Sequence, residues 1–203
     1  MAESGERLLS RAPGRLPVVG VMGSGRDPHA ARARRVGAWI AAAGCHLLTG
    51  GGEGVMEAVT EAFVGVPDRP GRAIGILPGS AGGPGAPASG ETPPGYPNRW
   101  VEIAIRTHLD ARGARGDGAD SRNHLNVLTS DVVIVLPGGA GTASEARLAL
   151  RYGRPAVAYL ANRTDVPGLP EAIPVETRFA RVQAFVRAAC RWQAAPPPDA
   201  LTR

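Results

Sequence analysis

The segment 131–151 constrains the fold of this 203-residue chain more than any other part of it. It opens with an apolar, largely β-branched run from Val132 to Leu136, which is typical of a strand buried in a parallel sheet. Glycine-rich residues follow, and the spacing of apolar residues beyond them predicts a helix over 142–151. A buried strand that enters a helix through a glycine-rich turn indicates one strand–turn–helix unit of an α/β protein.

The same alternation of apolar runs and helical spacing continues along the chain. The predicted strands are 18–22, 46–49, 73–77, 100–105, 132–136 and 156–160, and the predicted helices are 28–43, 55–64, 121–130, 142–151 and 175–192. Strands that alternate with helices pair in parallel through right-handed crossovers. The sequence therefore predicts a single-domain, doubly wound, Rossmann-like α/β fold, in which a mostly parallel sheet carries helices on both faces.

Length and composition favour one domain with irregular ends. A chain of 203 residues with 43% hydrophobic residues suffices for one packed core, which we expect over residues 16–192. Residues 1–15 are polar and arginine-rich, so we expect a flexible arm there, and the proline-rich residues 193–203 predict a disordered tail. Residues 79–98 and 110–120 are rich in glycine, proline or charge and are expected to form surface loops.

The absence of lysine excludes several chemistries. All 23 basic residues are arginine, so no side chain can form a Schiff base, which excludes pyridoxal-phosphate enzymes and lysine-dependent aldolases. A Walker-type NTPase is excluded too, because it needs the lysine of the P-loop. The two cysteines and four histidines have no metal-ligand spacing, so we expect no metal site and no required cofactor.

Charge and hydropathy restrict the partners. The net charge of +5 is compatible with nucleic acid, but the arginines are scattered and no aromatic-rich RNA motif occurs, which disfavours that partner. A positive field equally attracts small phosphorylated ligands. No stretch approaches the ~20 apolar residues of a membrane span, and the N-terminus does not resemble a signal peptide. We therefore expect a cytoplasmic protein without membrane association.

The turn from Pro137 to Thr142 has the composition of a phosphate cradle. Glycines let backbone N–H groups approach an anion closely, and the start of a helix attracts negative charge. Thr142 is expected to cap the helix and to offer its hydroxyl to a phosphate oxygen. Glu145 lies one helical turn further on. We predict a phosphate on the N–H groups of Gly139 to Thr142, with a carboxylate beside it.

Two other glycine-rich turns follow predicted strands. They are Gly23-Ser24-Gly25 and the run from Gly50 to Gly54. In doubly wound sheets, ligands bind where the carboxyl ends of strands meet helix N-termini, so we expect Gly51 to Gly54 to form the wall opposite the phosphate. Strand-to-helix turns also use glycine for packing alone, and that alternative stays open for both turns.

These motifs resemble those of a known family. The segment from Pro137 to Glu145 matches the Pro-Gly-Gly-x-Gly-Thr-x-x-Glu signature of the LONELY GUY-type superfamily, which was long mislabelled as lysine decarboxylases. Residues 50–58 resemble its second glycine motif, and Ser121-Arg122-Asn123 resembles its third. The resemblance covers residues 17–160 and implies the same doubly wound fold and a homo-oligomer, often a dimer.

Two branches of that superfamily imply different functions. Phosphoribohydrolases cut the N-glycosidic bond of cytokinin nucleoside 5′-monophosphates to give the free base and ribose 5-phosphate. The molybdenum-cofactor-carrier-like branch binds a phosphorylated pterin without transforming it. The hydrolases usually have Arg-Lys where this chain has Arg122-Asn123, and Met-Gly where it has Met56-Glu57. The chain is more similar to the carrier branch at both positions, so molybdenum cofactor is a candidate ligand.

The resemblance also implies site residues. Arg122 and Glu145 are the candidate catalytic pair, because a carboxylate can stabilise an oxocarbenium-like ribose or activate water, and an arginine can hold the phosphate. Alternatively, Glu145 complements the helix dipole and Arg122 forms a surface salt bridge. The candidate ligand-binding residues are Gly23, Ser24, Gly51, Gly52, Gly54, Val55, Met56, Asn123, Pro137, Gly138, Gly139, Gly141 and Thr142.

Overall fold

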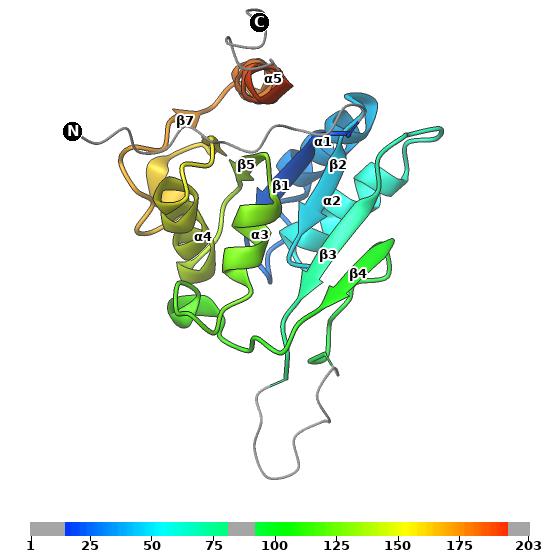
Figure 1. Cartoon of the computed structure of the whole chain (residues 1–203). Coiled ribbons are helices and arrows are strands. Elements are labelled where there is room, and N and C mark those ends of the chain that lie inside the picture. Colours follow the sequence, from blue (N-terminus) through cyan, green and yellow to red (C-terminus); the bar gives the residue numbers. More distant parts are fainter. Residues whose placement is uncertain (1–14, 81–91, 195–203) are drawn as a thin grey trace, which may run out of the picture.

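The computed structural model describes residues 15–80 and 92–194, the last four of them without their side chains (Figure 1). The expected arm at 1–15, the tail at 193–203 and the middle of the loop at 79–98 lie almost wholly outside these residues. No helix in the described ranges is long and apolar enough to cross a membrane.

A seven-stranded sheet, parallel throughout, forms the centre of the molecule (Figure 1). Its strands are β1 (Val18–Met22), β2 (His46–Thr49), β3 (Ala73–Leu77), β4 (Ile103–Arg106), β5 (Val132–Val135), β6 (Ala156–Tyr159) and β7 (Val175–Glu176). Their order is β4-β3-β2-β1-β5-β6-β7, so the chain builds outward from β1 and then returns to place β5 on its other side. The predicted doubly wound α/β fold is confirmed, and its order reverses between β1 and β5.

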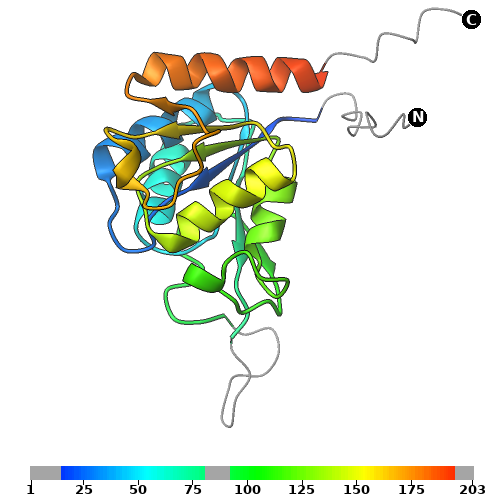
Figure 2. The same cartoon turned by 90° about the vertical axis from the view of Figure 1, so that its left-hand side faces the viewer.

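Helices cover both faces of this sheet, as the alternation of buried side chains requires. On β5, Val132 and Ile134 pack in one apolar cluster, whereas Val133 and Val135 pack in the other. The first cluster takes in α1 (Ala30–Ala42), α2 (Val55–Val64) and α5 (Phe179–Ala194), and the second takes in α3 (Asn123–Thr129) and α4 (Ala140–Arg151). Figure 2 shows α5 and α4 with strands of the sheet between them.

Two elements differ from the sequence prediction at the edges of the sheet. The helix expected over 175–192 begins only at Phe179, because Val175 and Glu176 extend along β6 as β7. The strand expected over 100–105 runs from Ile103 to Arg106 instead. Just before its start, the carboxylate of Glu102 accepts a hydrogen bond from the backbone N–H of Ala73 at 2.9 Å. Edge strands are often short, so their few residues are easily assigned to a longer neighbouring pattern in the sequence.

The segment 110–120 is more ordered than a plain surface loop. It contains a short 3-10 helix, η1 (Gly113–Arg115), and Ala111 forms a parallel bridge with Ser121. A second 3-10 helix, η2 (Arg163–Asp165), follows β6. The helix expected over 121–130 runs from Asn123 to Thr129, directly after that bridge. The bridge at Ser121 therefore fixes the position at which α3 begins.

Gly37 should be essential for the close packing of α1 on α2. A Cβ atom at this position would lie 2.1 Å from the carbonyl oxygen of Val59, which is backbone and cannot swing away. We expect Gly37→Ala to lower the free energy of unfolding by about 1–3 kcal/mol, despite the better helix propensity of alanine. Chemical denaturation measures this change.

Gly25→Ala is the matched control. A Cβ atom there would meet only the end of Met56, at 3.6 Å, which is ordinary contact. We expect this variant to be no less stable than the wild type, because alanine restricts the unfolded chain. Equal losses in the two variants would contradict the assigned packing.

Candidate functional site

The three glycine turns meet at the carboxyl edge of the sheet, and Ser24 joins them. The backbone N–H of Ser24 donates to the carbonyl of Pro137 at 2.9 Å, and the carbonyl of Ser24 accepts from the N–H of Val55 at 2.8 Å. The turn after β1 thus lies between the turns after β5 and β2, as β1 lies between those strands. This is the point of strand-order reversal, where doubly wound folds bind their ligands.

Several glycines at this edge are needed for the turns to approach one another. A Cβ atom on Gly138 would lie 2.2 Å from Thr142 Oγ1 and 2.9 Å from the nitrogen of Ser24. One on Gly54 would lie 2.5 Å from the carbonyl oxygen of Ser24, and Gly54 also has a φ of +65°. One on Gly23 would lie 2.7 Å from the side chain of Val55. Packing alone therefore explains glycine at these three positions, which was the alternative left open for the glycine turns.

Gly139 is different, because nothing in the described structure requires glycine there. A Cβ atom on Gly139 would meet no atom within 4 Å, and its φ of −104° is open to any residue. Gly141 is nearly as open, since the nearest atom to its Cβ position is the Cα of Gly113 at 3.6 Å. Bare backbone thus borders open space at the start of α4.

The first turn of α4 presents N–H groups to that space. Gly139 is the N-cap, and the first intrahelical bond runs from the N–H of Ala143 to the carbonyl of Gly139 at 3.0 Å. The N–H groups of Ala140, Gly141 and Thr142 therefore have no intrahelical acceptor. A twelve-residue helix adds the positive end of its dipole to them.

The expected capping role of Thr142 is wrong. The helix predicted from 142 begins at Ala140, so Thr142 is its third residue, and no side chain caps the helix. The reason is that the extended backbone of Gly139 already provides the N-cap and Ala140 is a strong helix former. The Thr142 side chain instead is buried and packs against Gly138.

Arg122 is a buried cation that the described residues leave without an ion pair. It directly precedes α3, is 5% exposed and lies over Gly50, where a Cβ atom would be 2.3 Å from its Nη1. Its Nε and Nη1 atoms are buried and donate to no acceptor in the described structure. The alternative of a surface salt bridge is therefore wrong. A buried guanidinium with unused donors is stabilised by a bound anion.

Glu145 lies beside this cation, on α4. It is 8% exposed, and its Oε1 accepts a hydrogen bond from Asn126 Nδ2 of α3 at 2.9 Å. Burial raises the pKa of the Glu145 carboxyl above its usual value, while the charge of Arg122 and the bond from Asn126 act in the opposite direction. No acidic residue lies in the first turn of α4, so the alternative of a helix-dipole partner is wrong, because that effect fades beyond the first turn.

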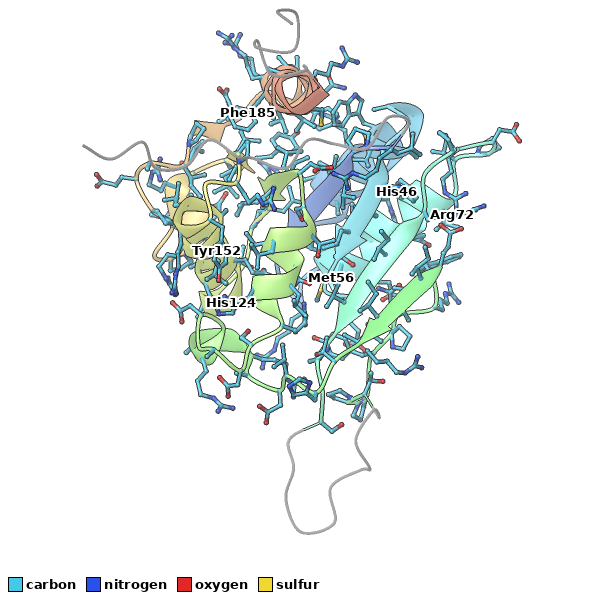
Figure 3. All side chains as sticks on the ribbon, in the orientation of Figure 1. His46, Met56, Arg72, His124, Tyr152 and Phe185 are labelled. Carbon is cyan, nitrogen blue, oxygen red and sulfur yellow. The ribbon has the colours of Figure 1, made fainter. Side chains whose placement is uncertain are left out.

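The other candidate residues divide between this site and the core. Asn123 is buried beside Ser144, since a Cβ atom on Gly116 would lie 2.6 Å from Asn123 Nδ2 and 2.7 Å from Ser144 Oγ. Val55 belongs to the apolar core, and Met56, labelled in Figure 3, is also buried. Gly51, with a φ of +74°, packs against Leu77 of β3.

His124 and Tyr152 fix α3 against α4 close to the site (Figure 3). The Nδ1 atom of His124 is 2.6 Å from the Tyr152 hydroxyl, and its Nε2 atom is 2.9 Å from the carbonyl oxygen of Gly118. A backbone carbonyl only accepts, so Nε2 carries a proton and donates it to Gly118. This chain of bonds connects both helices with the loop that contains η1.

Four residues at the site were absent from the predicted list of catalytic and ligand-binding residues. Asn126 follows Arg122 by one helical turn, so helical spacing could have indicated it. Gly50 lies next to a predicted wall. Tyr96 and Asn98 come from the glycine- and proline-rich segment, and Asn98 donates from its backbone to Gly51 O at 2.7 Å and from Nδ2 to Gly52 O at 2.8 Å. No local pattern could have placed that segment across the second glycine turn.

The fold and the edge geometry define a class: a doubly wound, all-parallel α/β protein whose glycine turns converge on one helix N-terminus. Within this class, the chain belongs to the SLOG cluster4 family, whose model matches residues 16–182.

Similar proteins and solved structures support this family assignment. The chain is 33% identical over 142 residues to a protein of Archaeoglobus fulgidus, which covers 69% of this chain and 78% of that protein. It is similar to the structure of a molybdenum cofactor binding protein from the phototrophic bacterium Rippkaea orientalis, with a TM-score of 0.63, 28% identity, and 87% of this chain and 99% of that chain covered. The Moco carrier protein from Chlamydomonas reinhardtii gives a TM-score of 0.63 and 28% identity over 88% of this chain and 99% of its own. The resemblance to the LONELY GUY-type and carrier-like superfamily is thereby confirmed.

Glu145 should make stability depend on pH. Because its pKa is raised on folding, the folded protein holds this proton more tightly than the unfolded chain does. The contribution of Glu145 to stability is therefore greatest below the usual carboxyl range and is lost as pH rises through the raised pKa. In Glu145→Gln this loss is absent.

Urea unfolding of both proteins across the acidic to neutral range measures the effect. The stability of Glu145→Gln relative to the wild type should increase with pH. Two stability curves that stay parallel over that range would show that burial does not raise the pKa of this carboxyl.

Proposed function

We propose that this protein binds the phosphate of a nucleotide-like or pterin ligand at the N-terminus of α4, as a carrier similar to molybdenum cofactor carriers. The observation that supports this most directly is the combination of open space over Gly139 with the buried guanidinium of Arg122, which forms no ion pair with any residue that the structure describes. The names of the similar proteins from Rippkaea orientalis and Chlamydomonas reinhardtii support the pterin cofactor as the ligand.

The residues of the site fit a phosphate group. The N–H groups of Ala140, Gly141 and Thr142 donate to its oxygens, since no intrahelical acceptor competes for them. Arg122 supplies a charge and further donors through Nε and Nη1. Molybdenum cofactor would be cargo held by its phosphate, and these residues contact that group rather than the metal.

Two substitutions test the phosphate site. Arg122→Gln should weaken the binding of inorganic phosphate and of AMP at least tenfold, because it removes charge-assisted hydrogen bonds worth about 1.5–3 kcal/mol. Gly139→Ala should weaken binding as well, because its methyl group occupies the space proposed for the phosphate. Its unfolding temperature should equal that of the wild type, because the methyl group meets no atom of the described structure. Isothermal titration calorimetry measures the affinities.

Arg151→Gln is the charge-matched control. Arg151 is exposed at the end of α4 and stacks on Tyr152, so its loss removes the same charge far from the first turn of the helix. Phosphate affinity should change less than twofold. If all three variants bind like the wild type, the anion does not bind at α4.

The second candidate function is a nucleoside 5′-monophosphate phosphoribohydrolase. It is favoured by the buried Glu145 carboxyl of raised pKa beside Arg122, since perturbed carboxyls gather at catalytic sites. In this reaction the bond from ribose C1′ to the base nitrogen breaks, water adds to C1′, and the base leaves with a proton. Glu145 would stabilise the positive charge on the ribose or activate the water.

An assay of base release separates the two functions. The protein is incubated with AMP and with isopentenyladenosine monophosphate, and free base is measured. We expect no release, together with saturable binding of molybdopterin. Base release that is lost in Glu145→Gln would establish the hydrolase and overturn the carrier.

We also propose a homo-oligomer built on the open end of the sheet. Ile103 and Ile105 of β4 are 44% and 41% exposed and share a sheet face with Ile76, because they are in register with β3. Ile76 packs in the same cluster as α3, on which Leu128 is 41% exposed. In Figure 1, no helix drawn in colour lies in front of β3 and β4 on this side. Among the residues that the structure describes, these side chains form one apolar face that nothing covers.

A single charge on this face should shift the oligomeric state. We expect Ile105→Asp to convert the wild-type oligomer to monomers without unfolding, because β4 is an exposed edge strand. Leu150→Asp, at the far end of α4 and equally exposed, is the control and should leave assembly unchanged. Sedimentation velocity measures the masses, and a monomeric wild type would refute the proposal.

A further inference from the structure

The ring of Tyr96 lies between the second glycine turn and Arg122. A Cβ atom on Gly52 would be 2.7 Å from the Cε1 and Cζ atoms of Tyr96, so the ring lies directly on that backbone. The guanidinium carbon of Arg122 is 5.9 Å from the centre of the ring. The Nη atoms of Arg122 lie against the backbone of Gly50, where a Cβ atom would be 2.3 Å from Nη1 and 2.5 Å from Nη2. The cation is therefore enclosed by a ring and by bare backbone.

Tyr96 is held in this place independently of Arg122. Its carbonyl accepts a hydrogen bond from Thr92 Oγ1 at 2.8 Å, and its N–H donates to Pro93 O at 3.2 Å. Two residues on, Asn98 makes the two hydrogen bonds to Gly51 and Gly52 described above. The backbone N–H and the buried side-chain amide of Asn98 thus fix the segment 92–98 to the second glycine turn, and the Tyr96 ring faces that turn.

An aromatic partner has a consequence that a carboxylate would not have. A cation–π contact stabilises a guanidinium through the face of a ring and uses none of its N–H donors. A carboxylate would accept two of those donors and compete with a bound anion. Within the described structure, Nε and Nη1 of Arg122 remain without acceptors although the side chain is buried.

We infer that Tyr96 is the positioning residue of the anion site: its ring orients Arg122 over Gly50 and leaves the guanidinium donors available to the ligand phosphate. This inference rests on the proposed function for the identity of the anion, but the contact between ring and guanidinium can be tested without a ligand. It predicts that the ring matters and that the Tyr96 hydroxyl does not.

The first experiment observes Arg122 in the ligand-free protein. The Nε–Hε cross-peak of Arg122 in a nitrogen-15 spectrum is assigned by its absence in Arg122→Gln. In Tyr96→Leu this peak should shift, because the ring current is removed, whereas in Tyr96→Phe it should stay near its wild-type position. Gly52→Ala, which displaces the ring, should shift it in a chain that keeps Tyr96. An unchanged peak in Tyr96→Leu and Gly52→Ala would overturn the inference, whatever the protein binds.

The second experiment measures inorganic phosphate affinity by calorimetry. Tyr96→Leu should weaken binding about tenfold and Tyr96→Phe less than twofold, as expected for a desolvated cation–π contact. In the Arg122→Gln background, Tyr96→Leu should add less than a twofold loss, because Tyr96 acts through Arg122. Additive losses would show a merely structural role and would contradict the inference.

The two proposals fail separately. If the Arg122 peak shifts as expected but the wild type binds neither phosphate nor AMP, the proposed function is wrong and the contact stands. If phosphate binds and depends on Arg122, but Tyr96→Leu leaves both the peak and the affinity unchanged, the anion site stands and Tyr96 has no part in it.

Discussion

Two backbone hydrogen bonds of Ser24 hold the candidate binding edge of this protein together. One connects it to Pro137 and the other to Val55, so the turns after three neighbouring strands share one central residue. These bonds need the turns to approach within contact distance, which is why side chains are missing at Gly23, Gly54 and Gly138. The convergence places the N-terminus of α4 and the buried Arg122 at a single edge of the sheet.

The glycines of the edge serve two purposes that the sequence motif cannot separate. Gly54 and Gly138 are required by atoms of the chain itself, because a Cβ atom there would overlap the backbone of the neighbouring turn. Gly139 has no such requirement, and its N–H lies next to a helix start whose donors have no intrahelical acceptor. A position that packing leaves unexplained is where a ligand would account for the residue.

Much of the fold follows from local sequence signals, and the misses have physical causes. The strands 18–22, 46–49 and 73–77 and the helix 55–64 were predicted with their observed bounds, because glycine or proline turns end each apolar run. Strand β7 was missed since its two residues continue a helical pattern, and its pairing with β6 is a tertiary contact. The partnership of Tyr96 with Gly52 and Arg122 joins three distant segments, so periodicity carries no trace of it.

The charges of the site bear on the choice between carrying a phosphate and cleaving a nucleotide. Asn123 is neutral where the hydrolase branch usually has lysine, so it adds no charge to that of Arg122. A phosphate at α4 would place negative charge near Glu145, whose pKa burial already raises, and like charges raise it further. Whenever this carboxyl is protonated, it repels a neighbouring phosphate less than a carboxylate would, and it also stabilises an oxocarbenium-like ribose less well. The electrostatics of these residues therefore support a site that holds its ligand over one that cleaves it.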